Sequence, residues 1–196
     1  VDAGLGRHTL MVSDEDATAG DGLTSARAVI DEDSITGLST GAITYQGTGT
    51  YAGGITLWTS RGADALLLDG SRADTGVRTV TTLNANLGND DVVAALEVAD
   101  GFANVNLEEG DDTFDAAGHT RPLVVFGGIG ADGITTGTNL DVVLGDVGRV
   151  EYRSANVPVT VLGNGGPGDK TDGVDRAVSL ITTVGKTGTG DTITSG

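Results

Sequence analysis

Short apolar clusters, bordered by small polar residues, recur along most of the chain. Examples are Val92-Val93, Val124-Val125-Phe126 and Val142-Val143-Leu144, each of which has Gly, Asp or Asn beside it. Brief β-branched runs favour strands, and Gly, Asp and Asn favour the tight turns between them. The pattern therefore predicts an all-β chain built from many short strands.

One turn pattern repeats, namely Gly, any residue, Asp, any residue and an apolar residue. Its glycines, Gly62, Gly88, Gly110 and Gly130, are 26, 22 and 20 residues apart. Such periods are typical of solenoids, in which each coil buries its apolar face against its neighbours. We therefore predict a parallel β-solenoid, either a β-helix or a β-roll, with Gly–Asp turns and coils of about 20–26 residues. At about 22 residues per coil, the chain would form about nine coils.

The regularity of the pattern varies along the chain. We expect residues 1–196 to form a single solenoid module, in which residues 1–50 make less regular N-terminal coils with a polar excursion. Residues 51–162 would make the regular coils, and residues 163–196 a loop followed by a C-terminal coil.

The composition narrows the classes of protein to consider. The 196 residues carry 28 acidic and 11 basic side chains, for a formal net charge of −17, and no Cys. This balance argues against a protein that binds nucleic acid, because phosphate contacts rely on Lys and Arg. No apolar run approaches the ~20 residues of a membrane span. An acidic, Gly-rich chain also invites the interpretation of disorder, but the β-branched clusters favour a folded chain.

The fourth copy of the turn pattern belongs to a longer motif. Residues 127–135 match every defined position of the nonapeptide G-G-x-G-x-D-x-U-x, in which U is apolar. A second unit, residues 136–144, follows in register with Gly137, Asn139 and Asp141 at the Gly, Gly and Asp positions. A third, residues 145–153, has Val150 at the Asp position. Three successive units are far more specific than one Gly-x-Asp triplet.

The residue types of the motif suit a hard cation. Glycine allows sharp turns that point carbonyl groups inward, and the Asp adds a carboxylate. Calcium takes six to eight oxygen ligands of these two kinds. Since one turn offers about half of them, the ion would be shared between turns stacked at rung spacing, and its binding energy would become folding energy.

The candidate calcium ligands are the Gly, Asn and Asp residues of these turns. Asp and Asn are also ordinary turn residues, so a solenoid can use them without a metal. The nonapeptide run favours calcium for Asp132 and Asp141, whereas both interpretations stay open for Asp64, Asp90 and Asp112. The full set is Gly62, Asp64, Gly88, Asp90, Gly110, Asp112, Gly128, Gly130, Asp132, Gly137, Asn139, Asp141 and Asp191.

Residues 123–153 resemble the RTX-type (haemolysin-type) calcium-binding repeats, and the wider pattern resembles the giant secreted and cell-surface bacterial proteins that carry them. Residues 4–14 resemble the G-x-G-x-x-T-L-x-V-x-D rung of those proteins, and residues 190–196, with Asp191, resemble the start of another calcium repeat. The resemblance implies a parallel β-solenoid, export from the cell and calcium-dependent folding. Asn139 in place of a Gly and Val150 in place of an Asp depart from the family pattern.

No catalytic motif stands out. His8 and His119 are the only histidines, and no zinc-protease, phosphate-loop or nucleophile-elbow signature is present. We therefore expect a non-enzymatic structural module at the cell surface or outside the cell, acting as a rigid spacer or a self-assembling filament, matrix or surface-layer segment. Its partners would be neighbouring copies or modules. The alternatives are a carbohydrate-binding adhesin segment and a polysaccharide-active β-helix enzyme.

Overall fold

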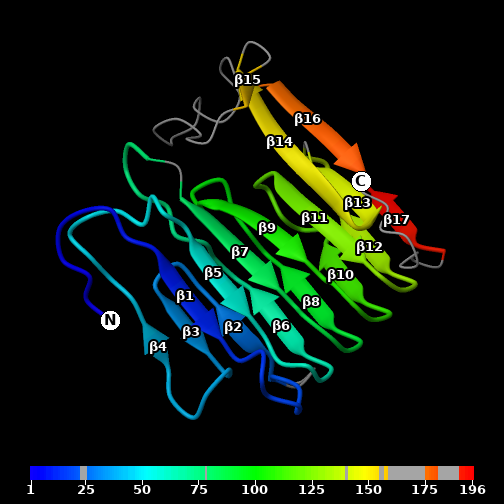
Figure 1. Cartoon of the computed structure of the whole chain (residues 1–196), viewed down its shortest axis with the longest axis horizontal. Helices are drawn as coiled ribbons and strands as arrows, with labels where there is room; N and C mark the ends of the chain where they lie inside the picture. Colours follow the sequence, from blue (N-terminus) through cyan, green and yellow to red (C-terminus); the bar gives the residue numbers. More distant parts are fainter. Residues whose placement is uncertain (23–25, 78, 140, 155–156, 159–174, 181–189) are drawn as a thin grey trace.

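The structure is a computed structural model that describes residues 1–22, 26–77, 79–139, 141–154, 157–158, 175–180 and 190–196. Within these residues every regular element is a strand, which confirms the predicted all-β class. Figure 1 shows most strands lying side by side as successive rungs of a stack. None of the described segments forms an apolar helix of membrane-spanning length. Residues 163–174, predicted as part of a loop, lie outside the described ranges.

Two sheets of parallel strands make the body of the molecule. The first has the strand order β1 (Leu10–Ser13), β5 (Ile55–Trp58), β7 (Val80–Asn84), β9 (Phe102–Asn106), β11 (Leu123–Gly128) and β13 (Val142–Asp146). The parallel part of the second has the order β2 (Ala28–Ile30), β6 (Ala65–Leu68), β8 (Asp91–Ala94), β10 (Thr113–Ala116), β12 (Gly133–Thr136) and β17 (Thr192–Ser195). The chain alternates between the two sheets, so each coil supplies one strand to each.

The apolar residues of the predicted clusters stack in columns between the sheets. Along the first sheet the register aligns Leu57, Leu83, Val105 and Val125, all of which are fully buried. Along the second it aligns Leu66, Val92, Phe114 and Ile134, which are at most 1 % exposed. Because strand side chains alternate between faces, one apolar residue in two is enough to build this core.

The parallel β-solenoid is confirmed, but the six parallel strands in each of its two sheets correspond to about six coils rather than nine. The difference arises because parts of the chain leave the coil. After β2, the strands β3 (Ser34–Thr36) and β4 (Ile43–Thr44) add to the second sheet in antiparallel fashion.

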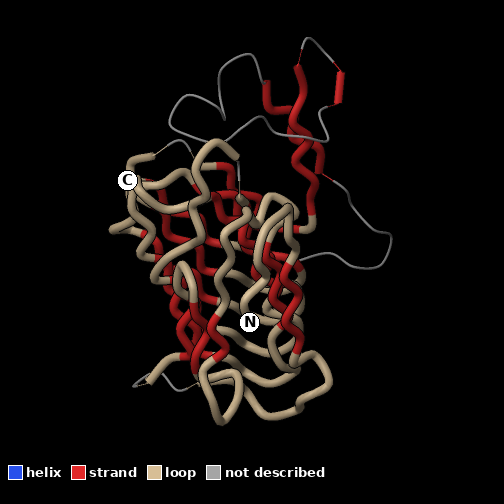
Figure 2. Tube along the Cα trace, turned by 90° about the vertical axis from the view of Figure 1, so that its left-hand side faces the viewer, coloured by secondary structure: helices blue, strands red, loops and turns tan. Residues whose placement is uncertain are grey.

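A third sheet consists of β14 (Gly148–Ser154), β15 (Val157–Pro158) and β16 (Asp175–Leu180), paired antiparallel. Figure 2 shows it projecting beyond the stacked coils. The third nonapeptide unit predicted from sequence, residues 145–153, runs into β14 and does not continue the coil.

Candidate cation-binding ladder

The Gly-x-Asp turns lie at one edge of the solenoid, where the chain passes from the first sheet to the second. Each motif Asp directly precedes a strand of the second sheet, and each is 1–2 % exposed. The coils differ in length, but the turn before each of these aspartates does not. In the first sheet the strand register aligns one row of residues across the coils, and each motif Asp comes six residues after its own coil's member of that row. This turn therefore has a constant length, and the residues that stack are Asp64, Asp90, Asp112 and Asp132.

Hydrogen bonds link these aspartates from coil to coil. The backbone N–H of Asp64 donates to Oδ1 of Asp90 at 2.8 Å, and the N–H of Asp90 donates to Oδ1 of Asp112 at 2.8 Å. The N–H of Asp112 donates to Oδ1 of Asp132 at 3.0 Å, and that of Asp132 donates to Oδ1 of Asp191 at 3.1 Å. The structure thus brings five of the six predicted aspartates into one column, which we call the aspartate ladder.

The ladder has a sixth member that the sequence pattern missed. The N–H of Asp21 donates to Oδ1 of Asp64 at 2.5 Å, and Asp21 is 7 % exposed. Ala19 stands where the pattern expects Gly, so the triplet did not match. The signal that remained was an Asp two places before an apolar residue, Leu23, which is too common a pattern to be specific.

One oxygen of each buried ladder carboxyl group has no partner in the described structure. The Oδ2 atoms of Asp21, Asp64, Asp90, Asp112 and Asp132 are buried without a hydrogen bond. In all of these except Asp21, Oδ1 accepts the backbone N–H of the preceding ladder residue. An ionised oxygen in such a place is costly unless a proton or a cation compensates it. These buried oxygens are therefore candidate ligands for a cation.

Burial raises the pKa of four ladder carboxyl groups. Desolvation raises the pKa of Asp90 to about 8, that of Asp112 to about 7 and that of Asp132 to about 6. Desolvation, with the charges of Asp64 and Asp14, raises the pKa of Asp21 to about 7. Neighbouring carboxylates add to each shift, and the amide hydrogen bonds oppose it. In the absence of a cation, these four carboxyl groups therefore keep their protons to a higher pH than ordinary aspartates do.

Glycine is required in the ladder turns because the coils approach closely there. A Cβ on Gly110 would lie 1.6 Å from the carbonyl oxygen of Gly88, and one on Gly130 would lie 1.7 Å from that of Gly110. A Cβ on Gly88 would lie 2.5 Å from the carbonyl oxygen of Gly62. A Cβ on Gly128, whose φ is +105°, would lie 2.0 Å from the carbonyl oxygen of Glu108. The repeated glycines thus stack backbone on backbone.

Oxygen atoms of two successive coils lie very close to the backbone of the nonapeptide turn. A Cβ on Gly127 would lie 2.6 Å from Oδ2 of Asp132 and 2.1 Å from the carbonyl oxygen of Gly145, one coil farther on. Among the described residues no three His, Cys, Asp or Glu side chains converge as a metal-binding group.

Asp141 and Asn139 do not join the ladder, although the nine-residue period placed them in the same kind of site. They lie at the opposite edge, where the chain returns from the second sheet to the first. Oδ1 of Asp141 accepts the N–H of Leu123 at 3.0 Å and lies 3.0 Å from Nε2 of His119. Asn139 donates to the carbonyl oxygen of His119 at 2.8 Å. Gly137 lies beside the same turn, where a Cβ on it would come nearest to the carbonyl oxygen of Ala117.

His119 is a second residue that sequence reasoning did not place. It is 3 % exposed, its Nδ1 faces the carbonyl oxygen of Ala116, and its Nε2 faces Asp141. Oδ2 of Asp141 is a further buried oxygen without a partner. Asp141 thus accepts a backbone N–H from another coil, as the ladder aspartates do, but at the opposite edge of the solenoid. Its carboxyl group also lies beside the imidazole of His119.

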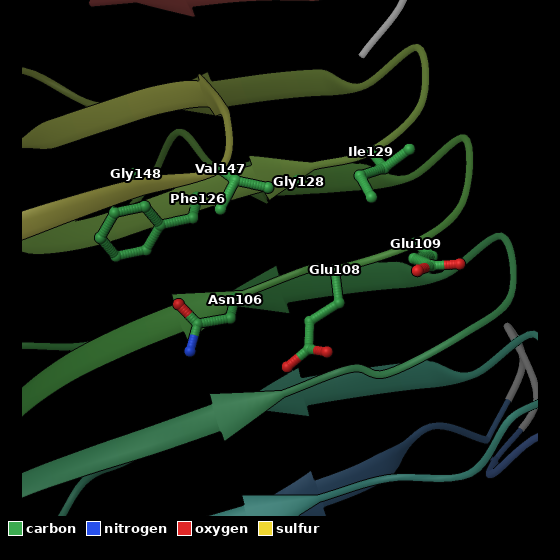
Figure 3. A pocket seen from close by; sticks show the side chains of 8 residues that line it. All are labelled: Asn106, Glu108, Glu109, Phe126, Gly128, Ile129, Val147 and Gly148. Carbon is green, nitrogen blue, oxygen red and sulfur yellow. The ribbon is translucent and has the colours of Figure 1, made fainter. Parts of the chain in front are cut away.

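A separate open cavity of about 330 Å³ lies beside β11 and the start of β14. Figure 3 shows the ring of Phe126, the amide of Asn106 and the carboxyl group of Glu108 on one side, with Ile129 and Glu109 at the far end. An aromatic ring beside polar groups is the usual make-up of a small-ligand site. This cavity does not include the ladder carboxylates.

Comparison of the chain with protein-family models, with curated protein sequences and with solved structures finds no match. The likeness to RTX-type repeats therefore rests on the motifs of the sequence alone.

Proposed function

We propose that this chain is a calcium-stabilised structural module of an extracellular bacterial protein, which acts as a rigid spacer or as a self-assembling filament, matrix or surface-layer segment. The observation that carries the proposal is the aspartate ladder, because five of its carboxyl groups each bury an oxygen without a partner. Oxygen ligands supplied by carboxylates and glycine carbonyls are those that calcium prefers. The RTX-type resemblance of residues 123–153 points to the same ion.

In this proposal calcium acts as a staple between coils. The residues that would hold it are the ladder aspartates together with backbone carbonyl groups of the Gly-x-Asp turns, Asp132 and the Gly145 carbonyl above all. The bound ion supplies positive charge among buried carboxylates that otherwise repel one another. Because these ligands converge only in the folded coil, binding free energy becomes folding free energy.

Assembly with neighbouring copies or modules is the second part of the proposal. The strand β1 is an end strand of its sheet, and end strands offer backbone groups to another chain. Stacking that does not close on itself gives filaments. Calcium is abundant outside cells, so folding and assembly would follow export.

The experiment is a calcium titration of the full chain, followed by circular dichroism and electron microscopy, with a chelator and with magnesium as controls. We expect calcium to raise the thermal stability and to promote ordered assemblies, and magnesium to do neither. Equal stability and equal assembly in excess chelator would overturn the proposal.

The cavity of Figure 3 favours glycan binding as a second candidate function. Half-buried Phe126 offers a ring face to the C–H groups of a sugar. The Asn106 amide donates from Nδ2 to Oδ1 of Asn84 at 2.6 Å, and its oxygen can accept a hydrogen bond from a sugar hydroxyl group. In affinity electrophoresis with neutral polysaccharides, Phe126→Ala should abolish any retardation of the native chain. Met11→Ala, at a residue that is 66 % exposed on β1, is the matched control. No retardation of the native chain would exclude this candidate.

A further inference from the structure

A cavity of about 240 Å³ lies at the return edge, on the side of the solenoid away from the aspartate ladder. Three successive return turns line it, namely those between β6 and β7, between β8 and β9, and between β10 and β11. Val77 and Val98 give it apolar walls, and Val98, which is 68 % exposed, stands at its rim. Of its described lining residues, none belongs to the ladder or to the cavity of Figure 3.

The guanidinium group of Arg121 distinguishes this cavity. Arg121 lines the cavity although it is only 8 % exposed, and its guanidinium carbon lies 4.0 Å from the centre of the Phe102 ring. Its Nη1 donates to the carbonyl oxygen of Val98 at 3.3 Å. Its Nε is buried and donates to no group of the described structure. Since a guanidinium carries five N–H donors, this one has donors that the surrounding protein does not satisfy.

The positive charge of Arg121 also lacks a close counter-charge. None of the ion pairs formed by the described residues includes Arg121. Burial lowers the pKa of Arg121 and the charge of Asp100 raises it. Both oxygens of Asp100, however, already accept backbone N–H groups, from Ser71 at 3.4 Å and from Glu97 at 2.6 Å. Arginine stays protonated in proteins, and a buried charge is costly unless it is paired, so an anion in the cavity would be stabilising.

The walls favour a small anion with a single charge. Asp74 and Asp100 both line the cavity, so a phosphate dianion would meet two carboxyl groups there. A carboxylate carries one charge, and its two oxygen atoms match the planar guanidinium fork. Asp74 is already bonded, because its Oδ1 accepts from Nε of Arg72 at 3.0 Å and its Oδ2 from the hydroxyl group of Thr79 at 2.8 Å. A volume of about 240 Å³ is small for a ligand pocket and suits a short organic acid or one sugar.

We propose that this cavity binds the carboxylate group of a small organic acid or of a uronic acid, with the Arg121 guanidinium as its hydrogen-bond donor and counter-charge. The apolar walls would contact the hydrocarbon part of the ligand. Such a site gives the module a ligand in addition to its proposed structural role, and it does not depend on calcium in the ladder.

The test is a titration of the full chain with acetate, with glucuronate and, as an uncharged control, with glucose. Isothermal titration calorimetry measures binding, and the NMR signal of the Arg121 Nε–H group reports its place. We expect one or both carboxylates to bind and to shift this signal, and glucose to do neither. Binding of glucuronate alone would assign the site to acidic sugars, and binding of acetate alone to small organic acids. A native chain that binds neither carboxylate would overturn the proposal.

Substitution of Arg121 tests its role directly. Arg121→Met keeps an unbranched side chain against Phe102 and removes the donors, so it should weaken carboxylate binding about tenfold or more. Arg61→Met is the matched control, because it removes the same charge from a side chain that is 53 % exposed and does not line the cavity. Equal binding by the native chain and by Arg121→Met would overturn the proposal.

A second variant keeps the test decisive if Arg121→Met fails to fold. Ala99 is exposed and lines the cavity, so Ala99→Trp should obstruct the cavity without disturbing the core. Its Tm should equal that of the native chain, while its carboxylate binding should be lost. Full binding by the folded Ala99→Trp variant would place the ligand elsewhere and overturn the proposal.

Discussion

The backbone N–H of Asp112 donates a 3.0 Å hydrogen bond to Oδ1 of Asp132, its counterpart one coil farther along. Both residues are at most 2 % exposed, and each keeps its second carboxylate oxygen buried without a partner. One side chain thus satisfies a neighbour's amide and offers an oxygen to a proton or an ion. The ladder therefore couples the stacking of the coils to the ionic conditions around the protein.

Removal of one ladder acceptor should destabilise the stack. Asp112→Ala leaves the buried N–H of Asp90 without its acceptor, which should cost about 1–3 kcal/mol of unfolding free energy. Asp112→Asn keeps an oxygen for that amide and should cost less. Urea denaturation in chelator, followed by circular dichroism, measures both. An equal loss in the two variants would show that the hydrogen bond is not the cause.

Without calcium, the protein should be more stable at pH 5 than at pH 8. The pKa values of Asp90, Asp112 and Asp132 are raised in the folded chain to about 8, 7 and 6, so the folded state holds protons that the unfolded state has lost. This stabilisation is complete below the unfolded pKa near 3.8 and is lost as pH rises through the folded values. Thermal melts in chelator from pH 4 to 9 should show Tm falling over this window.

The control for the pH dependence is Asp90→Asn. The overall negative charge also grows with pH and lowers stability, but this variant removes only one titrating rung. Its Tm should fall less steeply than that of the native chain between pH 6 and 8. A native Tm that rises with pH in chelator would contradict the raised pKa values.

The close stacking of glycines should make their substitution costly. In Gly110→Ala the new Cβ would start 1.6 Å from the Gly88 carbonyl oxygen, so two coils must separate, at a cost of about 3 kcal/mol. Gly118→Ala is the matched control, since a Cβ there meets nothing within 4 Å. The comparison of their urea midpoints checks the prediction, and similar midpoints would rule out close stacking at Gly110.

The sequence predicts the ladder better than the length of the stack, for a physical reason. In the coils of Asp64, Asp90, Asp112 and Asp132 the ladder turn has one length and carries glycines that close backbone stacking requires, so its pattern can be recognised in the sequence. The return turns differ in length and carry no repeated motif, which hides how much of the chain leaves the coil. Nine residues make about half a coil, so Asp132 and Asp141 fall at opposite edges although they share a motif position. The contact between His119 and Asp141 joins two return turns, and no local sequence pattern predicts it.

The His119–Asp141 contact should fasten the return edge in the way that the ladder fastens the other. The His119 side chain is fully buried and that of Asp141 is 5 % exposed, with Nε2 and Oδ1 3.0 Å apart. His119→Ala leaves the buried carboxyl group of Asp141 without this hydrogen-bonding neighbour, which should cost about 1–3 kcal/mol. Asp141→Asn keeps an oxygen for the Leu123 amide and removes the charge. In a double-mutant cycle measured by urea denaturation, the two changes should show a coupling of about 0.5–3 kcal/mol, whereas strictly additive effects would mean that the two side chains do not act as a pair.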